Sequence, residues 1–211
     1  LNVTNGPVYP HAIWMPAGDS DEVRHLALFS KIPFGSVRMH HDLSYPYFGD
    51  RKTPDRGVLE VTFDSNGTKW KLINLHLKSK WTERKDDPEA TIRREREARA
   101  IRDYLRKTNP PGSNPCYLVV GDFNDHRNSA PLRRFLQVND TVLTSMIPCE
   151  DSRGHRWTQH WAKADSYSRF DYILATPPML KRWVPGSAKI VDGPHSALAS
   201  DHRMIFADFR F

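Results

Sequence analysis

Several features that mark particular protein classes are scarce or absent in this chain of 211 residues. Two cysteines exclude a disulfide-rich scaffold, and there is no Cys/His cluster of the kind that binds zinc. No apolar run approaches the ~20 residues that a membrane-spanning helix needs. The N-terminal LNVTNGPVYP has neither the basic start nor the apolar core of a signal peptide. We therefore expect a soluble protein, one that could be secreted if a signal peptide has been removed.

The composition is that of an ordinary globular domain. Hydrophobic residues make up 38% and charged residues 27%, and 211 residues suffice for one core, so we expect a single domain over 1–211. The net charge of +6 suits a phosphate-bearing partner, although this is only a weak indication. The sequence does not decide whether Cys116 and Cys149 form a disulfide, but Cys116 is better interpreted as a small buried hydrophobe at the start of a strand. Nothing in the sequence indicates an oligomeric state.

Apolar runs and alternation predict a mixed arrangement of strands and helices. The predicted strands cover residues 25–33, 57–64, 69–79, 117–120, 170–176 and 203–211, with Asn66-Gly67 at the centre of a hairpin turn. Helical periodicity predicts helices over 87–107, with Pro88 in its first turn, and over 130–137. The Arg-rich face of the first helix could bind nucleic acid, but a solvated face with i,i+4 ion pairs is the better interpretation.

Polar side chains recur where apolar strands end or on the side of a strand opposite its apolar face. In KWKLINLHLKS, Asn74 and His76 share one face of the strand, while Ile73, Leu75 and Leu77 share the other. The run VVGDFND ends a buried strand with Asp122, Asn124 and Asp125, where a simple turn would suffice. Asp171 begins FDYILAT, and Ser200-Asp201-His202 precedes the last strand. Each alone has an ordinary structural explanation; the set in this order predicts one reaction centre.

These motifs resemble the endonuclease/exonuclease/phosphatase family, which has the DNase I-like fold. INLHLKS, VVGDFND, RFDYIL and SDHRMIFADF follow the family's order, and the resemblance covers essentially the whole chain. It implies an α/β (α+β) protein, a four-layer sandwich of two packed mixed β-sheets flanked by helices. The site would lie at one edge, where the strand ends converge.

The resemblance also implies roles for particular residues. The implied catalytic residues are His76, Asp122, Asn124, Asp171, Asp201 and His202. His202 would act as general base and Asp201 would orient it, while Asp171 would orient His76 or another imidazole. Arg56 would contact the phosphate, and Asn74 and Trp157 are further candidates for substrate binding. Asp201 and Asp122 are the candidate ligands of Mg²⁺ or Mn²⁺, which prefer hard oxygen donors.

The sequence departs from the family at its start. The family's first strands carry an Asn and a Gln-Glu whose carboxylate is the main metal ligand, and neither motif is found here. The chain opens like the segment that follows them, so we expect a domain truncated at its N-terminus relative to the family. Mg²⁺ affinity of this chain is accordingly expected to be weak.

The sequence does not determine the substrate. We expect a metal-dependent phosphoesterase that hydrolyses phosphodiester bonds, with a nuclease favoured over the family's inositol phosphatase branch, whose signature is missing beside SYSRFDYIL. Two Trp in HRWTQHW could stack on bases, although packing roles explain them at least as well. One alternative is a non-catalytic module that binds phosphate or nucleic acid. Another is a phosphodiesterase acting on a lipid or a small phosphoester.

Overall fold

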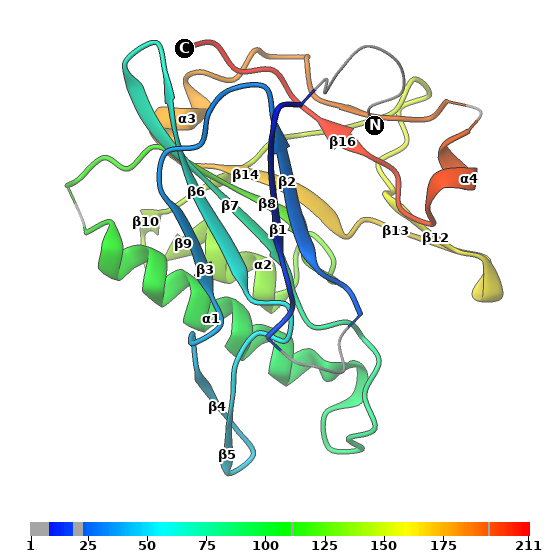
Figure 1. Ribbon diagram of the computed structural model, residues 1–211. Coiled ribbons are helices and arrows are strands. Elements are labelled where there is room, and N and C mark those ends of the chain that lie inside the picture. Colours follow the sequence, from blue (N-terminus) through cyan, green and yellow to red (C-terminus); the bar gives the residue numbers. More distant parts are fainter. Residues whose placement is uncertain (1–8, 19–22, 111, 194) are drawn as a thin grey trace.

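The computed structural model describes residues 9–18, 23–110, 112–193 and 195–211, and a mixed six-stranded sheet forms its centre (Figure 1). The strand order is β11-β14-β8-β7-β6-β3. The strands cover β3 Val37–His40, β6 Val58–Ser65, β7 Thr68–His76, β8 Tyr117–Asp122, β11 Ser145–Met146 and β14 Asp171–Ala175. β7 and β8 are parallel because α1 connects them, and the other neighbours are antiparallel.

The helices α1 and α2 cover one face of this sheet, and short strand pairs together with α3 cover the other. The helices are α1 Thr91–Thr108, α2 Ala130–Leu136, α3 Pro177–Leu180 and α4 Ser196–Ala199, with 3-10 turns at Pro88–Ala90 and Ala162–Ala164. The remaining strands are β1 His11–Met15, β2 Leu26–Ser30, β4 Tyr45–Tyr47, β5 Asp50–Lys52, β9 Gln137–Val138, β10 Thr141–Val142, β12 Gln159–Trp161, β13 Ser166–Ser168, β15 Lys189–Ile190 and β16 Ile205–Phe206. The expected mixed α/β fold class is confirmed. Among the described residues, the layer opposite α1 and α2 contains the separate pairs β1–β2 and β15–β16 together with α3.

The alternation of side chains along the strands explains this layering. Ile73, Leu75 and Val119 are fully or almost fully buried against α1 and α2. Leu72 and Leu118, one residue earlier on the same strands, face the opposite layer, where β15, β16 and α3 supply the contacts. Both faces of the central strands are therefore buried, as expected of a sheet with a parallel pair at its centre.

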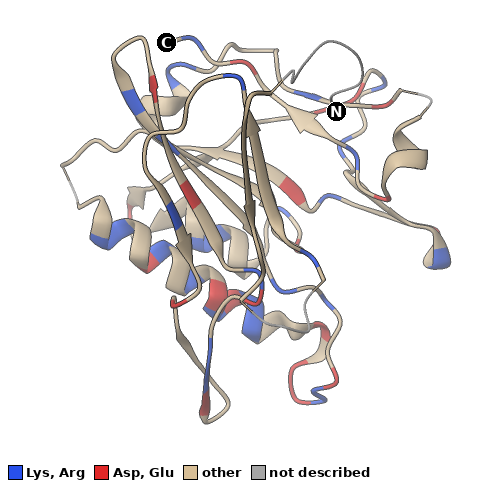
Figure 2. Ribbon diagram, in the orientation of Figure 1, with Lys and Arg blue, Asp and Glu red and all other residues tan. Residues whose placement is uncertain are grey.

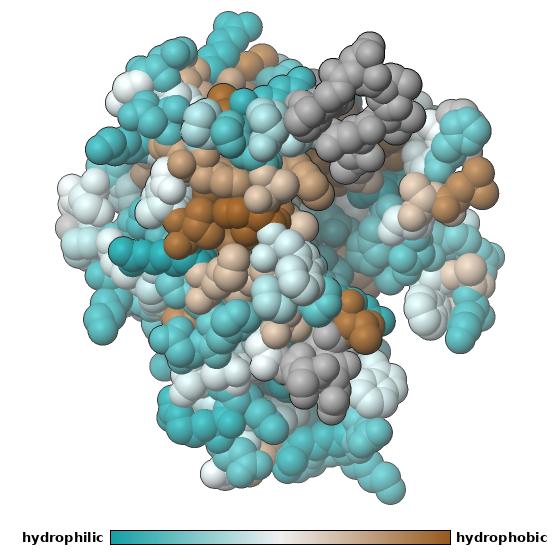
Figure 3. Space-filling model, in the orientation of Figure 1, coloured by the Kyte–Doolittle hydropathy of each residue, from teal (hydrophilic) through white to brown (hydrophobic). Residues whose placement is uncertain are grey.

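A further apolar cluster fixes the β1–β2 pair on the sheet. Met15 and Leu26 are buried against Leu59 and Val61 of β6. Figure 3 shows an apolar band between β3 and the β1–β2 pair, surrounded by hydrophilic side chains. This cluster is continuous with the one under β15–β16 through side chains of β7.

α1 begins four residues later than the sequence predicts. Glu89 and Ala90 adopt left-handed backbone conformations, so the helix starts at Thr91. Asp87 caps it from a distance, because its carboxylate accepts the backbone N–H groups of Ile92 and Arg93 at 2.8 and 3.0 Å. Figure 2 shows basic and acidic residues interleaved along the helix, which agrees with the solvated interpretation of this face.

Two other expectations are settled by the structure. The last predicted strand, 203–211, was too long, because only Ile205–Phe206 pairs regularly and its partner β15 has just two residues. Cys116 and Cys149 are both free thiols, which decides against the disulfide.

Candidate active site

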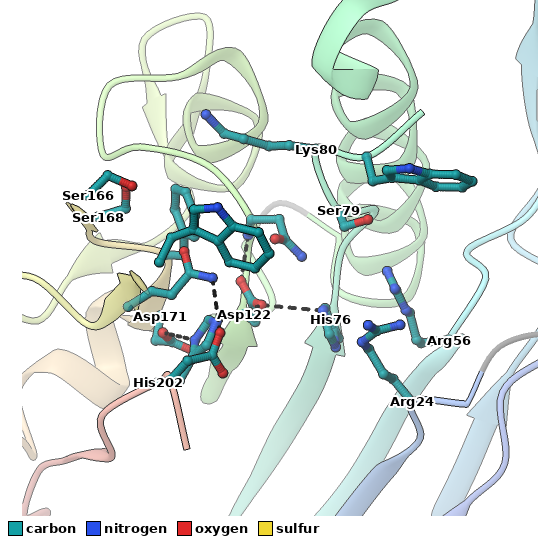
Figure 4. Close-up of a pocket in the computed structure, with 16 residues that line it drawn as sticks. Arg24, Arg56, His76, Ser79, Lys80, Asp122, Ser166, Ser168, Asp171 and His202 are labelled. Atoms are coloured by element: carbon teal, nitrogen blue, oxygen red, sulfur yellow. Dashed lines mark hydrogen bonds and ion pairs between the residues drawn. The ribbon is translucent and has the colours of Figure 1, made fainter. Parts of the chain in front are cut away.

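The polar strand ends singled out in the sequence converge on one cavity of about 800 Å³ (Figure 4). Its lining includes all six residues predicted to be catalytic: His76, Asp122, Asn124, Asp171, Asp201 and His202. Strand register explains the convergence, because His76 of β7 and Asp171 of β14 are both the pairing partners of Asp122 on β8. Three adjacent strands thus bring their polar side chains side by side at one end of the sheet.

Gly121 makes the close approach of β7 and β8 possible at this end. Its φ is +131°, and a Cβ at this position would lie 1.9 Å from the carbonyl oxygen of Leu75. A side chain there would have to displace backbone, so the glycine in VVGDFND is required by geometry. The run therefore combines a backbone constraint with the carboxylate that follows it.

His202 pairs with Asp171, which corrects the pairing expected from the sequence. Nδ1 of His202 lies 2.8 Å from Oδ2 of Asp171, whereas Asp201 accepts a long hydrogen bond, 3.5 Å, from the Gln159 side chain. The expected orientation of His202 by Asp201 is wrong, whereas Asp171 does hold an imidazole of the site, that of His202 rather than that of His76. The carboxylate that reaches His202 comes from β14 and not from the neighbouring residue in the chain.

The electrostatics of the site couple its carboxylates to its imidazoles. Burial alone would lower the pKa of His202, but the hydrogen bond and charge of Asp171, with the charge of Asp122, outweigh it and raise that pKa to about 9. Burial and the nearby charge of Asp171 raise the pKa of the Asp122 carboxyl to about 7, against the opposing effect of His202. Nε2 of His76 and Nε2 of His202 lie 3.3 and 3.9 Å from Oδ2 of Asp122. Crowded carboxylates and imidazoles of this kind are typical of reaction centres.

Two buried residues anchor the end of β7 beneath the cavity. The side-chain amide of Asn124 and a guanidinium N–H of Arg56 both donate to the carbonyl oxygen of Leu77, at 2.9 and 3.1 Å. The backbone N–H of Asn124 in turn donates to Oδ1 of Asp122 at 2.7 Å, and its φ is +50°. Both residues also line the cavity, so each is placed to hold the scaffold and to face a ligand.

Several lining residues were not among the predicted site residues. Arg24, Lys80 and Trp81 line the cavity, and so do Gln159 and Trp161. Trp81 is 70% exposed and Trp161 48% exposed, so both present large aromatic surfaces at the rim. Trp161 belongs to the HRWTQHW segment, whose two Trp are the sequence signal for it. Trp81 lies five residues beyond His76, in a segment whose sequence has no pattern to single it out.

Two predicted substrate-binding residues lie elsewhere. The Asn74 amide donates to the Ala27 carbonyl oxygen at 3.2 Å, so it bridges β7 to β2 in the opposite layer. Trp157 lines a neighbouring cavity, and the guanidinium of Arg203 lies over its ring at 3.3 Å. Neither residue is among those lining the cavity with His202.

The donor set suits a hard divalent cation. Asp122, Asp171 and His202 offer ligand atoms that all lie within 4.8 Å of one another. Of the two predicted metal ligands, Asp122 belongs to this group, and Asp201 lines the same cavity. Carboxylate oxygens are the donors that Mg²⁺ and Mn²⁺ prefer, and a cation would offset the repulsion between Asp122 and Asp171. The residues present therefore fit the expected metal.

Layers and site together define a mixed α/β sandwich protein with an Asp–His centre at converging strand ends. The family model of the endonuclease/exonuclease/phosphatase family matches residues 6–202. The chain belongs to this family. No curated protein matches the sequence.

Solved structures of the same fold cover nearly all of the chain. An endonuclease/exonuclease/phosphatase family protein from Leptotrichia buccalis is 14% identical with a TM-score of 0.61, over 95% of this chain and 71% of its own. The human Nocturnin catalytic domain with bound sulfate is 14% identical with a TM-score of 0.64, over 95% and 72%. A Staphylococcus aureus beta toxin mutant with bound magnesium ions is 16% identical with a TM-score of 0.57, over 96% and 75%. At such identities the likeness concerns the fold.

None of the described helices is long and apolar enough to cross a membrane.

Proposed function

We propose that this protein is a metal-dependent phosphoesterase that hydrolyses phosphodiester bonds, and that its substrate is nucleic acid. The observation that carries the proposal is the His202–Asp171 pair beside Asp122 and His76 in one cavity. Arg24, Arg56 and Lys80 line the same cavity and supply the positive charge that an anionic phosphodiester needs.

Each side chain has a role that its position supports. Asp171 holds the imidazole of His202 through Nδ1, which leaves Nε2 facing Asp122 and available to accept a proton from the attacking water. Asp122 would orient that water or assist the leaving group. His76 would donate to a phosphate oxygen, together with Arg56 and Asn124, as negative charge develops there.

Asp122, Asp171 and Asp201 are the residues that would hold Mg²⁺ or Mn²⁺. When bound, the metal would supply Lewis-acid polarisation of the phosphate. The similar fold of a beta toxin with bound magnesium ions supports this choice of cation. A cation at these carboxylates also favours the neutral imidazole that a general base requires, since their charge is what raises the pKa of His202.

The rim of the cavity favours nucleic acid as the substrate. Trp81 and Trp161 present exposed indole rings next to the cationic lining, and bases stack on such rings regardless of sequence. Lys78 lies 5.6 Å from the ring centre of Trp81 and Lys163 lies 5.8 Å from that of Trp161. Interleaved aromatic and basic side chains are what a single-stranded phosphodiester chain needs.

The test is a substrate panel assayed with Mg²⁺ and with EDTA. It comprises single-stranded DNA, bis-p-nitrophenyl phosphate and sphingomyelin vesicles. We expect Mg²⁺-dependent cleavage of the DNA, and His202→Ala should lower turnover by ~10²-fold or more, which is the usual contribution of a general base. His11→Ala is the matched control, because His11 lies on β1 and is not among the lining residues.

Each of the other outcomes would support a different function or mechanism. Turnover of sphingomyelin but not of DNA would show that the substrate is a lipid and not nucleic acid. DNA binding without turnover of any substrate would identify a non-catalytic binding module. Cleavage that His202→Ala leaves within a few-fold of wild type would remove His202 from the mechanism.

A further inference from the structure

The β12–β13 hairpin, which Figure 1 labels, contributes residues both to the candidate active site and to a second cavity of about 730 Å³. Strand alternation gives the hairpin two different faces. Gln159, Trp161, Ser166 and Ser168 line the active-site cavity, whereas the intervening pair, His160 and Tyr167, lines the second one. Asp201 lines both cavities, so they adjoin at the base of the hairpin.

The base of this hairpin is fixed to the reaction centre. Thr158 is fully buried, and its side-chain oxygen accepts the backbone N–H groups of Phe170 and Asp171 at 3.0 and 3.1 Å. The backbone N–H of Arg203 donates to Thr158, and that of His160 donates to Asp201, at 2.7 and 2.9 Å. A ligand that contacts the outer face of the hairpin is therefore held in a fixed relation to His202 and Asp171.

An aromatic stack forms the wall of the second cavity. The rings of Tyr167 and His160 are parallel within 9°, with centroids 4.4 Å apart. Trp157 packs edge-on against Tyr167 with centroids 4.9 Å apart. Arg203 lies 3.3 Å over the Trp157 ring and is paired with the buried Asp151 at 2.8 Å, which holds Trp157 from behind. Tyr167, which contacts both of the other rings, remains 54% exposed.

We propose that this second cavity binds a nucleobase of a single-stranded substrate whose phosphodiester occupies the active site. The inference rests on the proposed nuclease function and names a subsite for it. An exposed ring held in a rigid, pre-packed aromatic group is a platform on which another flat ring stacks with little loss of entropy. Asp192, Ser196 and Ser200 also line this cavity and can accept hydrogen bonds from the base edge.

The lining chemistry favours a base over a phosphate at this position. The basic residues Arg153 and Arg203 are opposed by Asp151, Asp192 and Asp201 in the same lining, so the cavity has no excess of basic over acidic side chains. Arg24, Arg56 and Lys80 line the active-site cavity together with the carboxylates proposed to hold the metal, whose charge a bound cation would offset. A strand would thus place its phosphate among the cations and its neighbouring base on Tyr167.

The experiment measures binding of two fluorescent DNA 12-mers in EDTA, so that turnover does not interfere. One carries all its bases and the other carries base-free residues throughout. We expect Tyr167→Ala to weaken binding of the base-bearing strand about tenfold, the effect of losing one stacked base, and to leave the base-free strand unchanged. Tyr167→Phe, which retains the ring, should bind like wild type. Phe29→Ala is the control, because Phe29 is similarly exposed, at 50%, on β2.

The outcomes separate this inference from the function on which it rests. If wild type and Tyr167→Ala bind the base-bearing strand with equal affinity, the base subsite is overturned. The phosphoesterase proposal is then unaffected. An equal loss on both strands, or loss in Tyr167→Phe as well, would also overturn it, since stacking requires only the ring. Failure of wild type to bind either strand would end both the nucleic acid substrate and its subsite.

Discussion

Gly121 determines how closely β7 and β8 approach at the end that carries the site. Its backbone conformation lies where side chains are disfavoured, and a Cβ would meet the Leu75 carbonyl at 1.9 Å. We expect Gly121→Ala to lower the free energy of unfolding by about 2 kcal/mol or more, the usual cost of such strain. Chemical denaturation measures this effect. Gly67→Ala is the control, because a Cβ at that φ of +78° meets nothing within 4 Å, so its cost isolates the contribution of φ alone.

Glu60 is at the centre of a buried hydrogen-bond network, through which the stability of the fold depends on pH. Its carboxylate accepts hydrogen bonds from Tyr104 and His40 at 2.6 and 3.2 Å and pairs with Lys71 at 3.2 Å. Burial alone would raise the pKa of Glu60, but these partners outweigh it and lower it to about 2. A carboxyl with a lowered folded-state pKa stabilises the fold fully above its unfolded pKa of about 4.5, and this contribution is lost as pH falls toward 2.

The corresponding variant is Glu60→Gln. We expect it to lose roughly 3 kcal/mol of unfolding free energy at pH 7, and to lose less further stability than wild type between pH 4.5 and 2. Urea denaturation at a series of pH values measures how the unfolding free energies of the variant and of wild type change with pH. Glu83→Gln removes the same charge at an exposed position and should follow the wild-type curve. Parallel curves for Glu60→Gln and wild type would show that Glu60 does not carry this dependence.

Among the elements, α1 supports the site from below. Arg94 is 1% exposed and donates to Asp125 at 2.9 Å and to the Lys78 carbonyl at 3.2 Å. The carboxylate of Glu97, also on α1, accepts the backbone N–H of Lys78 at 2.8 Å. The helix therefore holds the segments that follow both β7 and β8, on which His76 and Asp122 depend for position.

The buried pair makes this support testable. Asp125→Asn leaves Arg94 without its charged partner in a buried place, so we expect a loss of about 3 kcal/mol of unfolding free energy. Asp86→Asn breaks an exposed pair with Arg84, at 2.8 Å, and should cost no more than about 0.5 kcal/mol. Equal effects of the two variants in thermal denaturation would contradict a supporting role for the buried pair.

At the scale of the whole molecule, the buried charge of the site lowers the stability of the metal-free fold. Burial and Asp171 disfavour the charged form of Asp122, so a bound cation should stabilise the fold and Asp122→Asn should not weaken it in EDTA. With Mg²⁺ tenfold above its dissociation constant, wild type should gain about 1.4 kcal/mol of unfolding free energy. Denaturation with and without Mg²⁺ measures both effects. Asp64→Asn, an exposed control, should keep the Mg²⁺ gain, whereas a full gain in Asp122→Asn would place the metal elsewhere.

The sequence by itself determined the long central strands, the two longest helices and most residues of the candidate site. Period-two alternation identified β6 and β7, apolar runs identified β8 and β14, and helical spacing identified α1, because the local apolar pattern reflects which face is buried. Polar residues that interrupt such runs stand out for the same reason, and the six predicted catalytic residues all line one cavity. Their chemical roles stay predictions until they are measured.

Only the tertiary structure decided which side chains act together. Asp171 rather than Asp201 reaches His202, because β14 lies next to β8 while the chain turns Asp201 toward Gln159. Trp81 and Trp161 join the rim from segments without periodicity. Sequence neighbours share a strand, but partners across a site are set by strand order and register, which are long-range properties that no local pattern carries.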